Sequence, residues 1–186
     1  MCISNIILNV MGKDNVLYRE YYVTIDSNDR DRTIWADSGN FQVKMQPENT
    51  FQGATINRAF KNVRSIEVMN VIYPNVNKVT DEMYIFLCFP EIEGVFESTN
   101  YIGNKAIAKL IPSTLVGNYI SIHFDKGERP KRYFPFHGVR IDKLTVEFRK
   151  NNGDLFVFGP DNNDTPNRLL QTSITLRIIV RDKVIP

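Results

Sequence analysis

Hydrophobic and polar residues alternate along much of this chain. In the clearest example, Leu144, Val146 and Phe148 are separated by Thr145 and Glu147. A strand with this pattern buries one face and exposes the other, which is typical of antiparallel sheets. The same pattern recurs in three other segments, at residues 41–45, 119–124 and 173–180.

Eight segments have the composition of main strands, and turn residues separate them. They lie at residues 40–46, 62–73, 83–89, 106–111, 119–124, 132–136, 143–149 and 173–181. Eight short antiparallel strands in one domain predict an all-β sandwich of two sheets, and eight is also the number of a jelly roll. The count alone does not separate a jelly roll from other sandwiches of similar length.

Three local features refine this prediction. The segment at residues 62–73 is long and mixed in phase, which indicates a β-bulge. Asn152 and Gly153 follow the strand at residues 143–149 and predict a hairpin of type I′, because Asn-Gly tolerates positive φ. A short helical turn is expected at residues 54–60, and residues 22–25 are expected to form only a short strand.

Composition narrows the functional classes. The 23 basic and 21 acidic residues leave a net charge of +2, and the charges are interleaved, so no basic face for nucleic acid is expected. Cys2 and Cys88 are too few and too far apart for a disulfide framework or a zinc site, and Cys88 reads as a small buried hydrophobe. The apolar stretch at residues 6–11 is too short for a signal peptide, and no segment reaches the ~20 residues of a membrane span. We therefore expect folding in a reducing cytosol.

Candidate catalytic residues are scarce. His123 and His137 are the only histidines, one on the polar face of a strand and the other before a glycine. A nucleophile–base site or a histidine metal cluster needs more than two isolated histidines provide. The sequence therefore predicts a protein that is not an enzyme, with no catalytic residue, metal ligand or cofactor site.

Two acidic groupings leave weaker alternatives open. Glu91 and Glu93 share one face of an extended segment, a spacing compatible with glycosidase chemistry or a cation. Asp161 and Asp164 lie in an Asn-rich segment at residues 161–168 that is expected to be an exposed loop, where the two carboxylates could bind calcium. A carbohydrate-binding β-sandwich, with exposed aromatic rings and loop carboxylates, is the alternative from a different functional class.

Aromatic residues are the surplus in this composition, with 12 Phe, 8 Tyr and 1 Trp. Several occur where the alternation breaks, so their strands are apolar on both faces and need a second cover. That cover is either a loop of the same chain or another subunit. The residues that form this candidate subunit interface are Tyr84, Phe86, Phe89, Phe96, Tyr133, Phe134 and Phe136.

The most distinctive stretch, at residues 22–31, reads YVTIDSNDRD. It resembles the "IDSRDRD" opening of the single jelly-roll capsid proteins of nucleocytoplasmic large DNA viruses, with Asn28 where Arg is frequent. The strand at residues 143–149 and the turn after it are similar to the "LTI-x-F…-DG-x-L" hairpin of that family. The likeness extends from about residue 21 to residue 181, and the motif residues are Ile25, Asp26, Ser27, Asp29, Arg30 and Asp31.

The resemblance implies a structural protein of the virion, assembled in the host cytoplasm, with residues 21–186 forming one jelly roll and residues 1–20 an arm. Its partners would be itself and neighbouring major or minor capsid proteins. A small chain of this kind looks like the penton protein, a homopentamer at the five-fold vertices. A minor capsid protein beneath the facets is the alternative.

The motif can also be interpreted without the family. Asp26 and Ser27 can accept hydrogen bonds from the turn after the strand. Arg30 and Arg32 offer forked donors for carboxylates. The sequence does not decide whether those carboxylates lie inside the fold or across a subunit boundary.

Overall fold

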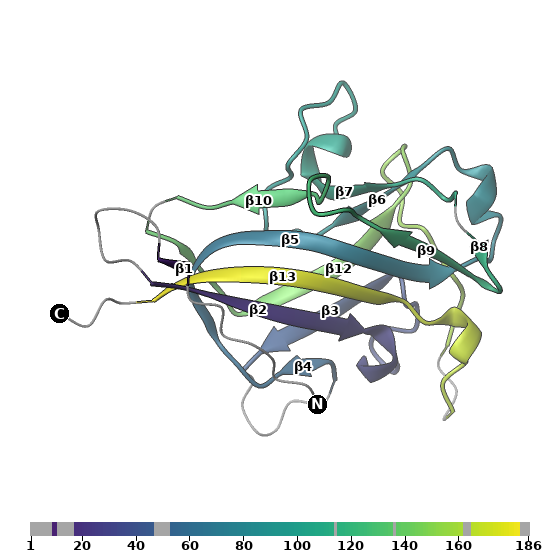
Figure 1. The fold of residues 1–186 in the computed structure, drawn as a ribbon. Helices are drawn as coiled ribbons and strands as arrows, with labels where there is room; N and C mark the ends of the chain where they lie inside the picture. The colour runs from purple at the N-terminus through teal and green to yellow at the C-terminus, as the bar shows by residue number, and fades with distance from the viewer. Residues whose placement is uncertain are drawn as a thin grey trace.

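The computed structural model describes residues 9–10, 17–46, 53–113, 115–135, 137–161 and 165–182. Within these residues the chain forms two β-sheets that pack face to face (Figure 1). The helices in this part of the chain are short 3₁₀ turns, namely η1 (Ser27–Asp29), η2 (Val79–Asp81), η3 (Gly103–Lys105) and η4 (Arg168–Leu170). The predicted all-β class with two largely antiparallel sheets is confirmed.

The larger sheet is antiparallel throughout. Its strands, in spatial order, are β1 (Asn9–Val10), β2 (Leu17–Asp26), β13 (Ser173–Asp182), β5 (Phe60–Pro74), β9 (Tyr119–His123) and β8 (Leu115–Val116). Two further strands, β10 (Lys131–Tyr133) and β11 (Val139–Ile141), pair with the first half of β5. The long strand β5 therefore has β13 along one edge and three shorter strands along the other.

The smaller sheet covers the inner face of the larger one. Its order is β4 (Thr55–Ile56), β3 (Asn40–Met45), β12 (Lys143–Arg149), β6 (Ile85–Cys88) and β7 (Ala106–Leu110). The two-residue strand β4 is parallel to β3, and the other pairs are antiparallel. The helical turn predicted at residues 54–60 is therefore wrong, because backbone hydrogen bonds from Lys44 to Ala54 and from Gln46 to Ile56 hold this segment extended.

Strand β2 is the main difference from the predicted strand set. Each of the eight predicted strands overlaps an observed one, but the short strand expected at residues 22–25 is ten residues long and pairs with β13 over its whole length. Residues 17–20, assigned to the N-terminal arm, thus belong to the sheet. The described residues contain thirteen strands rather than eight, because the long strand β2 and four short strands, β1, β4, β8 and β11, add to the predicted set.

The bulge predicted in β5 is confirmed, and there are two. The register between β5 and β13 skips Met69 and Arg64. The carbonyl of Met69 accepts a hydrogen bond from the Phe124 N–H at 3.0 Å, and that of Arg64 accepts one from the Phe134 N–H at 2.9 Å. The extra residues thus bend β5 and direct two carbonyls toward the segments along its other edge.

The turn after β12 lies where the sequence places it, but its type differs. Gly153 donates a backbone hydrogen bond to Lys150 at 3.1 Å, and Gly153 has φ 97°. Asn151 and Asn152 do not have positive φ, so the turn is not of type I′. A turn followed by one glycine of positive φ is typical of longer hairpin loops that contain a bulge. After the turn, Leu155 forms an isolated antiparallel β-bridge with Arg149.

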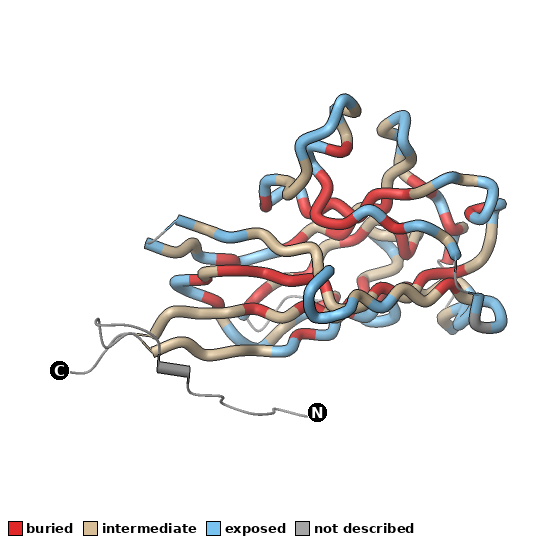
Figure 2. The backbone as a smooth tube through the Cα atoms, turned by 45° about the horizontal axis from the view of Figure 1, so that its top comes forward, coloured by how far each residue is buried: buried red, intermediate tan, exposed pale blue. Residues whose placement is uncertain are grey.

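The hydrophobic core fills the space between the two sheets. Figure 2 shows buried positions running along the strands, with the turns between them largely exposed. The alternation of apolar and polar residues along the strands predicts ten residues that face inward. Nine of them are at most 1% exposed, and the tenth, Ile122, is partly buried against them. The nine are Phe41, Val43, Ile66, Val68, Leu144, Val146, Phe148, Leu176 and Ile178.

One polar group in the core has no hydrogen bond. Tyr73 is 0% exposed, its ring centroid lies 5.8 Å from that of Phe148 and 6.0 Å from that of Phe158, and its hydroxyl has no partner among the described residues. Burial accordingly raises the pKa of this hydroxyl. The desolvation of the hydroxyl is uncompensated, so the side chain stabilises the fold through its ring.

Replacing Tyr73 by phenylalanine is expected to leave the free energy of unfolding unchanged or to raise it by about 1–2 kcal/mol, because an unsatisfied buried group is removed. Urea denaturation measures the change. Tyr119→Phe is the matched control, since the Tyr119 hydroxyl donates to the Arg168 carbonyl and its removal should cost about 1 kcal/mol. A clear loss of stability in Tyr73→Phe would show that the hydroxyl is satisfied after all.

Candidate functional site

The motif at residues 25–31 lies where β2 leaves the larger sheet. Asp26 accepts a hydrogen bond from the Asn28 N–H at 2.8 Å and so caps η1. Ser27 is fully buried; its N–H donates to the Thr172 carbonyl at 2.9 Å and its hydroxyl oxygen accepts from the Thr172 N–H at 2.8 Å. These bonds join the end of β2 to the residue that precedes β13.

Arg30 follows η1 and turns its guanidinium into the fold. Its Nε donates to the Trp35 carbonyl at 2.8 Å, Nη1 to the Ser27 carbonyl at 2.6 Å, and Nη2 to the Ala36 carbonyl at 3.1 Å. The loop between β2 and β3 is therefore wrapped around one side chain, which is 4% exposed. Two of these carbonyls also accept a backbone hydrogen bond, that of Ser27 from the Arg30 N–H at 3.2 Å and that of Ala36 from the Asp161 N–H at 2.9 Å, so the guanidinium adds to the backbone bonds of the loop.

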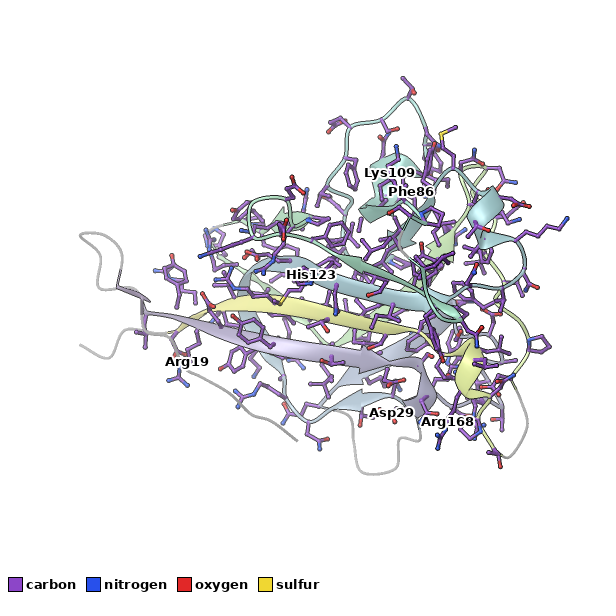
Figure 3. All side chains as sticks on the ribbon, turned by 45° about the vertical axis from the view of Figure 1, so that its right-hand side comes forward. Arg19, Asp29, Phe86, Lys109, His123 and Arg168 are labelled. Atoms are coloured by element: carbon purple, nitrogen blue, oxygen red, sulfur yellow. The ribbon has the colours of Figure 1, made fainter. Side chains whose placement is uncertain are left out.

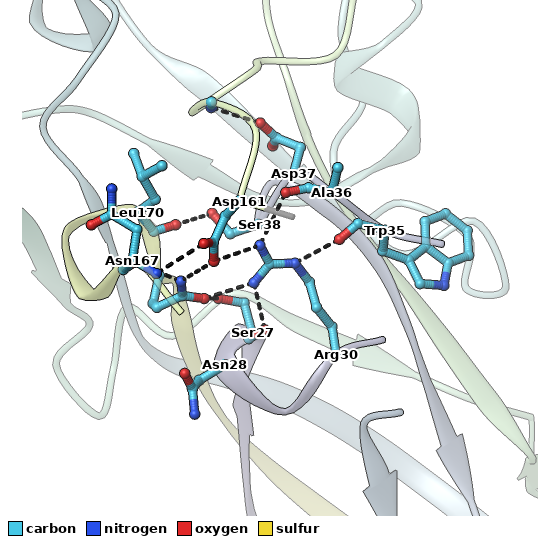
Figure 4. A network of polar contacts seen from close by, with 12 residues as sticks. Ser27, Asn28, Arg30, Trp35, Ala36, Asp37, Ser38, Asp161, Asn167 and Leu170 are labelled. Carbon is cyan, nitrogen blue, oxygen red and sulfur yellow. Dashed lines mark hydrogen bonds and ion pairs between the residues drawn. The ribbon is translucent and has the colours of Figure 1, made fainter. Parts of the chain in front are cut away.

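The remaining donors of Arg30 reach the loop before β13. Nη1 also donates to Oε1 of Gln171 at 2.7 Å, and Nη2 to Oδ2 of Asp161 at 3.2 Å. A guanidinium has five N–H donors, and these five contacts use all of them (Figure 4). Arg30 thus needs no partner from another subunit, which favours the interpretation that its acceptors lie within the chain.

Asp161 is the acidic partner of this arginine. Its side chain is 0% exposed, and it accepts from the Asn167 N–H at 2.8 Å and from Nε2 of Gln171 at 2.7 Å. Burial alone would raise the pKa of Asp161, but the Asn167 and Gln171 hydrogen bonds and the charge of Arg30 bring it below its usual value. The prediction of an exposed loop is therefore wrong at Asp161, whose carboxylate is occupied; Asp164 lies outside the described residues.

Acid is expected to weaken this network. In the unfolded chain the pKa of Asp161 returns to about 3.9, so the ionised carboxylate stabilises the fold above that pH, and the contribution is lost as the pH falls through the lower folded pKa. Urea denaturation of the wild type and Asp161→Asn between pH 2 and pH 6 tests this. The stability difference between them should shrink as the pH falls below about 4; a difference independent of pH would contradict the assignment.

A second set of contacts joins the same two loops. The Ser38 hydroxyl donates to the Leu170 carbonyl, and the Thr172 hydroxyl donates to the Ser38 carbonyl at 2.9 Å. Asp37 accepts from the backbone N–H of Gly39 and of Gly159, each at 2.7 Å. These contacts and those of Ser27 and Arg30 together form a clamp. The clamp holds the loop at residues 27–39 against residues 159–161 and 165–172.

The other acidic motif residues remain at the surface or bind locally. The Asp29 side chain is largely exposed. The partial burial that remains and the negative charge of the neighbouring Asp26 raise its pKa. Asp31 accepts from the Thr33 hydroxyl and N–H, which lower its pKa. Among the polar motif residues, Ser27 and Arg30 thus make the contacts that join the two loops, and Asp26 caps η1.

The predicted aromatic interface is largely covered by the chain itself. Phe86 and Cys88 of β6 lie on the outer face of the smaller sheet and are 4% and 3% exposed. The loop between β6 and β7 covers them with the partly buried Phe96 and Ile102. Phe89 is fully buried in the main core. Phe86 and Phe89 are therefore not available to another subunit.

The remaining aromatic candidates differ in exposure. Tyr84 is half-buried, with its ring 5.1 Å from that of Phe86 and Nζ of Lys109 4.1 Å from its centroid (Figure 3). Phe134 packs against the main core, whereas Tyr133 is 68% exposed. Phe136 lies outside the described residues. Among the described candidates, Tyr133 is the one that presents most of its side chain to solvent.

The exposed apolar side chains gather elsewhere, and sequence reasoning missed them. Of the nine large exposed hydrophobic residues in the described part of the chain, six lie in or beside the connections that follow β2, β5, β7 and β12, which the strand order brings to one end of the sandwich (Figure 1). They are Ile34, Met83, Ile111, Leu115, Val157 and Leu169. Apolar residues grouped at one end of a protein are candidates for contact with a partner.

An ionic ladder across the larger sheet was also not predicted. Nη1 of Arg177 lies 3.0 Å from both carboxylate oxygens of Glu67, and Nε of Arg177 donates to Glu20 at 3.1 Å. Lys131 adds a contact of 2.5 Å to Glu67, which is 1% exposed. Burial acts to raise the pKa of Glu67, but the bonds from Lys131 and Arg177 lower it overall. Each residue sits at a polar position of its strand, but their alignment depends on a register that the sequence does not show.

The groups considered for catalysis do not come together. His123 and His137 are both exposed, and the two lie in different segments. Glu91 accepts from the Thr145 N–H at 2.8 Å and hydroxyl at 2.7 Å, beside a hollow of about 270 Å³, while Glu93 pairs with Arg132. Within the described ranges, no group of three or more His, Cys, Asp or Glu residues could hold a metal ion.

Comparison with known proteins adds no identification. The chain matches no protein-family model, and no curated protein matches its sequence. In the part of the chain that the structure describes, no helix has the length and hydropathy needed to cross a bilayer. The function therefore has to be inferred from the strand order, the clamp and the exposed residues.

Proposed function

We propose that this chain is a non-enzymatic structural subunit of a viral capsid, folded as a single jelly roll. The observation that carries the proposal is the pairing order of its eight long strands. Taken along the chain, the first pairs with the last, the second with the seventh, the third with the sixth and the fourth with the fifth. The pairs are β2 with β13, β3 with β12, β5 with β9, and β6 with β7.

This order is what results when one long antiparallel hairpin is rolled up. Successive strand pairs then alternate between two sheets, so that the first and third pairs share one sheet and the second and fourth share the other. The larger sheet indeed contains β2-β13-β5-β9, and the smaller contains β3-β12-β6-β7. A double sheet of eight strands connected in this way supports the jelly roll, an architecture of viral capsid and lectin domains.

The clamp supports the capsid class within that architecture. The residues that carry the likeness to the viral family, Ser27 and Arg30 above all, hold two loops together. A motif with a purely structural task is what a family of shell proteins would share without sharing a reaction.

The exposed apolar residues supply a contact surface for assembly. A closed ring needs two different patches on each subunit, and a stable interface buries about 800 Å² per partner. The loop end that carries Ile34, Met83 and Leu169 and the outer face that carries Tyr133 are two such candidates. We therefore favour the penton, a homopentamer at the vertices, over a minor capsid protein beneath the facets.

The test is the position of the chain in a reconstructed particle. Purified virions would be imaged by cryo-electron microscopy, and density matching the sandwich would be located. Five copies around each vertex are expected. Copies spread beneath the facets would replace the penton role by the minor capsid role, and absence of the chain from purified virions would refute both.

A further inference from the structure

Strand β2 has a long edge without a partner in the described part of the chain. On one side it pairs with β13 over all ten residues, from Leu17 to Asp26. On the other side, β1 pairs only with Leu17 and Tyr18. No described strand lies against the rest of this edge, and β2 borders the larger sheet in Figure 1.

The direction of the backbone groups of β2 follows from its register. The Ser27 N–H donates to the Thr172 carbonyl, and the register from there to Leu17 is unbroken. Because N–H and C=O groups alternate sides along an antiparallel strand, every second residue back from Ser27 bonds β13, as Tyr21 and Val23 do. Glu20, Tyr22 and Thr24 therefore direct their backbone groups to the open edge.

Such an edge is a template for an additional strand. An unpaired row of N–H and C=O groups attracts another extended segment, and native proteins cover or interrupt it. Between Arg19 and Asp26 there is no proline and no bulge, and the residues include Tyr, Val, Thr and Ile, which favour strands. The side chains of Tyr22 and Thr24 are exposed, so nothing described shields this part of the edge.

The chain itself supplies a segment that is directed along this edge. In β1, Asn9 faces Tyr18 and Val10 faces Leu17, so the residues before Asn9 would continue antiparallel to β2. In the same register Leu8 would face Arg19, and Ile3 would face Thr24. Residues 3–8 read ISNIIL, an uncharged segment without proline that is rich in β-branched residues and suited to a strand.

We propose that the open edge of β2 is the docking site for residues 3–8 of the same chain, which add a strand to the larger sheet in the register of β1. The tether through β1 makes this pairing intramolecular, and therefore favours it over pairing with a free segment. Docking would close the edge against other strands. The inference concerns the isolated chain and does not depend on the capsid role.

Amide hydrogen exchange of the full chain, followed by NMR, tests the proposal through the alternation of β2. In this register Asn5 would bond Tyr22, whereas the N–H of Ser4 would point away from β2. Asn5→Pro removes one of the bonding N–H groups, and Ser4→Pro is the matched control. We expect Asn5→Pro to speed exchange at Glu20, Tyr22 and Thr24 about ten-fold, with little change in Ser4→Pro.

The amides of Tyr21 and Val23 serve as the internal check, because their bonds to β13 should keep them protected in every variant that folds. Equal effects of the two proline variants, or rapid exchange of the Tyr22 amide already in the wild type, would overturn the proposal. If Tyr21 and Val23 lose protection, the cross-linking variant described next decides.

Cross-linking tests the same register and identifies the chain that supplies the strand. In a Cys2→Ser background, Asn5→Cys with Tyr22→Cys should form a disulfide within one chain, because facing residues bring their Cα atoms to about 5.5 Å. Asn5→Cys with Glu20→Cys, on the same face but two residues out of register, should form it about ten-fold more slowly. Disulfide-linked dimers as the main product would assign the strand to a second copy and overturn the proposal, as would equal rates in the two variants.

Discussion

Replacing Arg30 by alanine is expected to lower the free energy of unfolding by about 3–5 kcal/mol, the range for losing one partner of a buried ion pair. The substitution leaves the carboxylate of Asp161 buried without its cation and removes the guanidinium hydrogen bonds to the carbonyls of Ser27, Trp35 and Ala36. The loops between β2 and β3 and before β13 lose their common anchor. Urea denaturation measures the loss.

Two further variants separate the geometry of Arg30 from its charge. Arg30→Lys keeps the charge but cannot make five forked hydrogen bonds, so it should retain only part of the lost stability. Arg140→Ala removes an exposed arginine paired with Asp142, and a surface pair of this kind should contribute less than about 1 kcal/mol. If Arg30→Ala cost no more than Arg140→Ala, the clamp would not stabilise the fold.

Replacing Phe148 by alanine is expected to cost about 3–5 kcal/mol, as for other large-to-small changes in a core. Phe148 is 0% exposed near the C-terminal end of β12, and its ring centroid lies 5.3 Å from that of Phe158 and 5.8 Å from that of Tyr73. Truncation leaves a cavity between the two sheets that these rings cannot fill without leaving their own contacts.

Phe148→Leu and Phe96→Ala serve as controls in thermal or urea denaturation. Leucine retains much of the apolar volume, so Phe148→Leu should cost clearly less than alanine. Phe96 is only partly buried on the outer face of the smaller sheet, so Phe96→Ala should also cost less than Phe148→Ala. A loss below about 1 kcal/mol for Phe148→Ala would mean that the two sheets do not pack around this ring.

Local alternation predicts the strands that have one buried and one wet face. Strand β12 is recovered from residue 143 to residue 149, because it is a central strand whose inner and outer neighbours differ in polarity. Strand β2 is underestimated, because most of its first half, from Leu17 to Tyr22, is of intermediate burial and shows no clean alternation. Edge position removes the contrast on which the sequence pattern depends.

The contacts of the candidate site likewise include some that the sequence predicts and others that it does not. The turn at Asp26 and Ser27 is a local matter, and its capping role could be predicted from residue type. The acceptors of Arg30 could not, because Asp161 and Gln171 lie 131 and 141 residues away along the chain. The cover of Phe86 by Phe96 and Ile102 likewise depends on how one loop folds back over β6, which alternation within a strand does not encode.

The central position of β13 sets the order in which this protein can be made. This strand, Ser173–Asp182, separates β2 from β5 in the larger sheet, so the edges of β2 and β5 that β13 covers stay unpaired until residues 173–182 have left the ribosome. Pairings over such sequence separations are slow to form and leave strand edges unprotected in the meantime. A nascent or prematurely terminated chain would thus present β2 and β5 without the strand between them, and would be a substrate for chaperones and proteases. We therefore expect that only chains that include residues 173–182 reach the folded state.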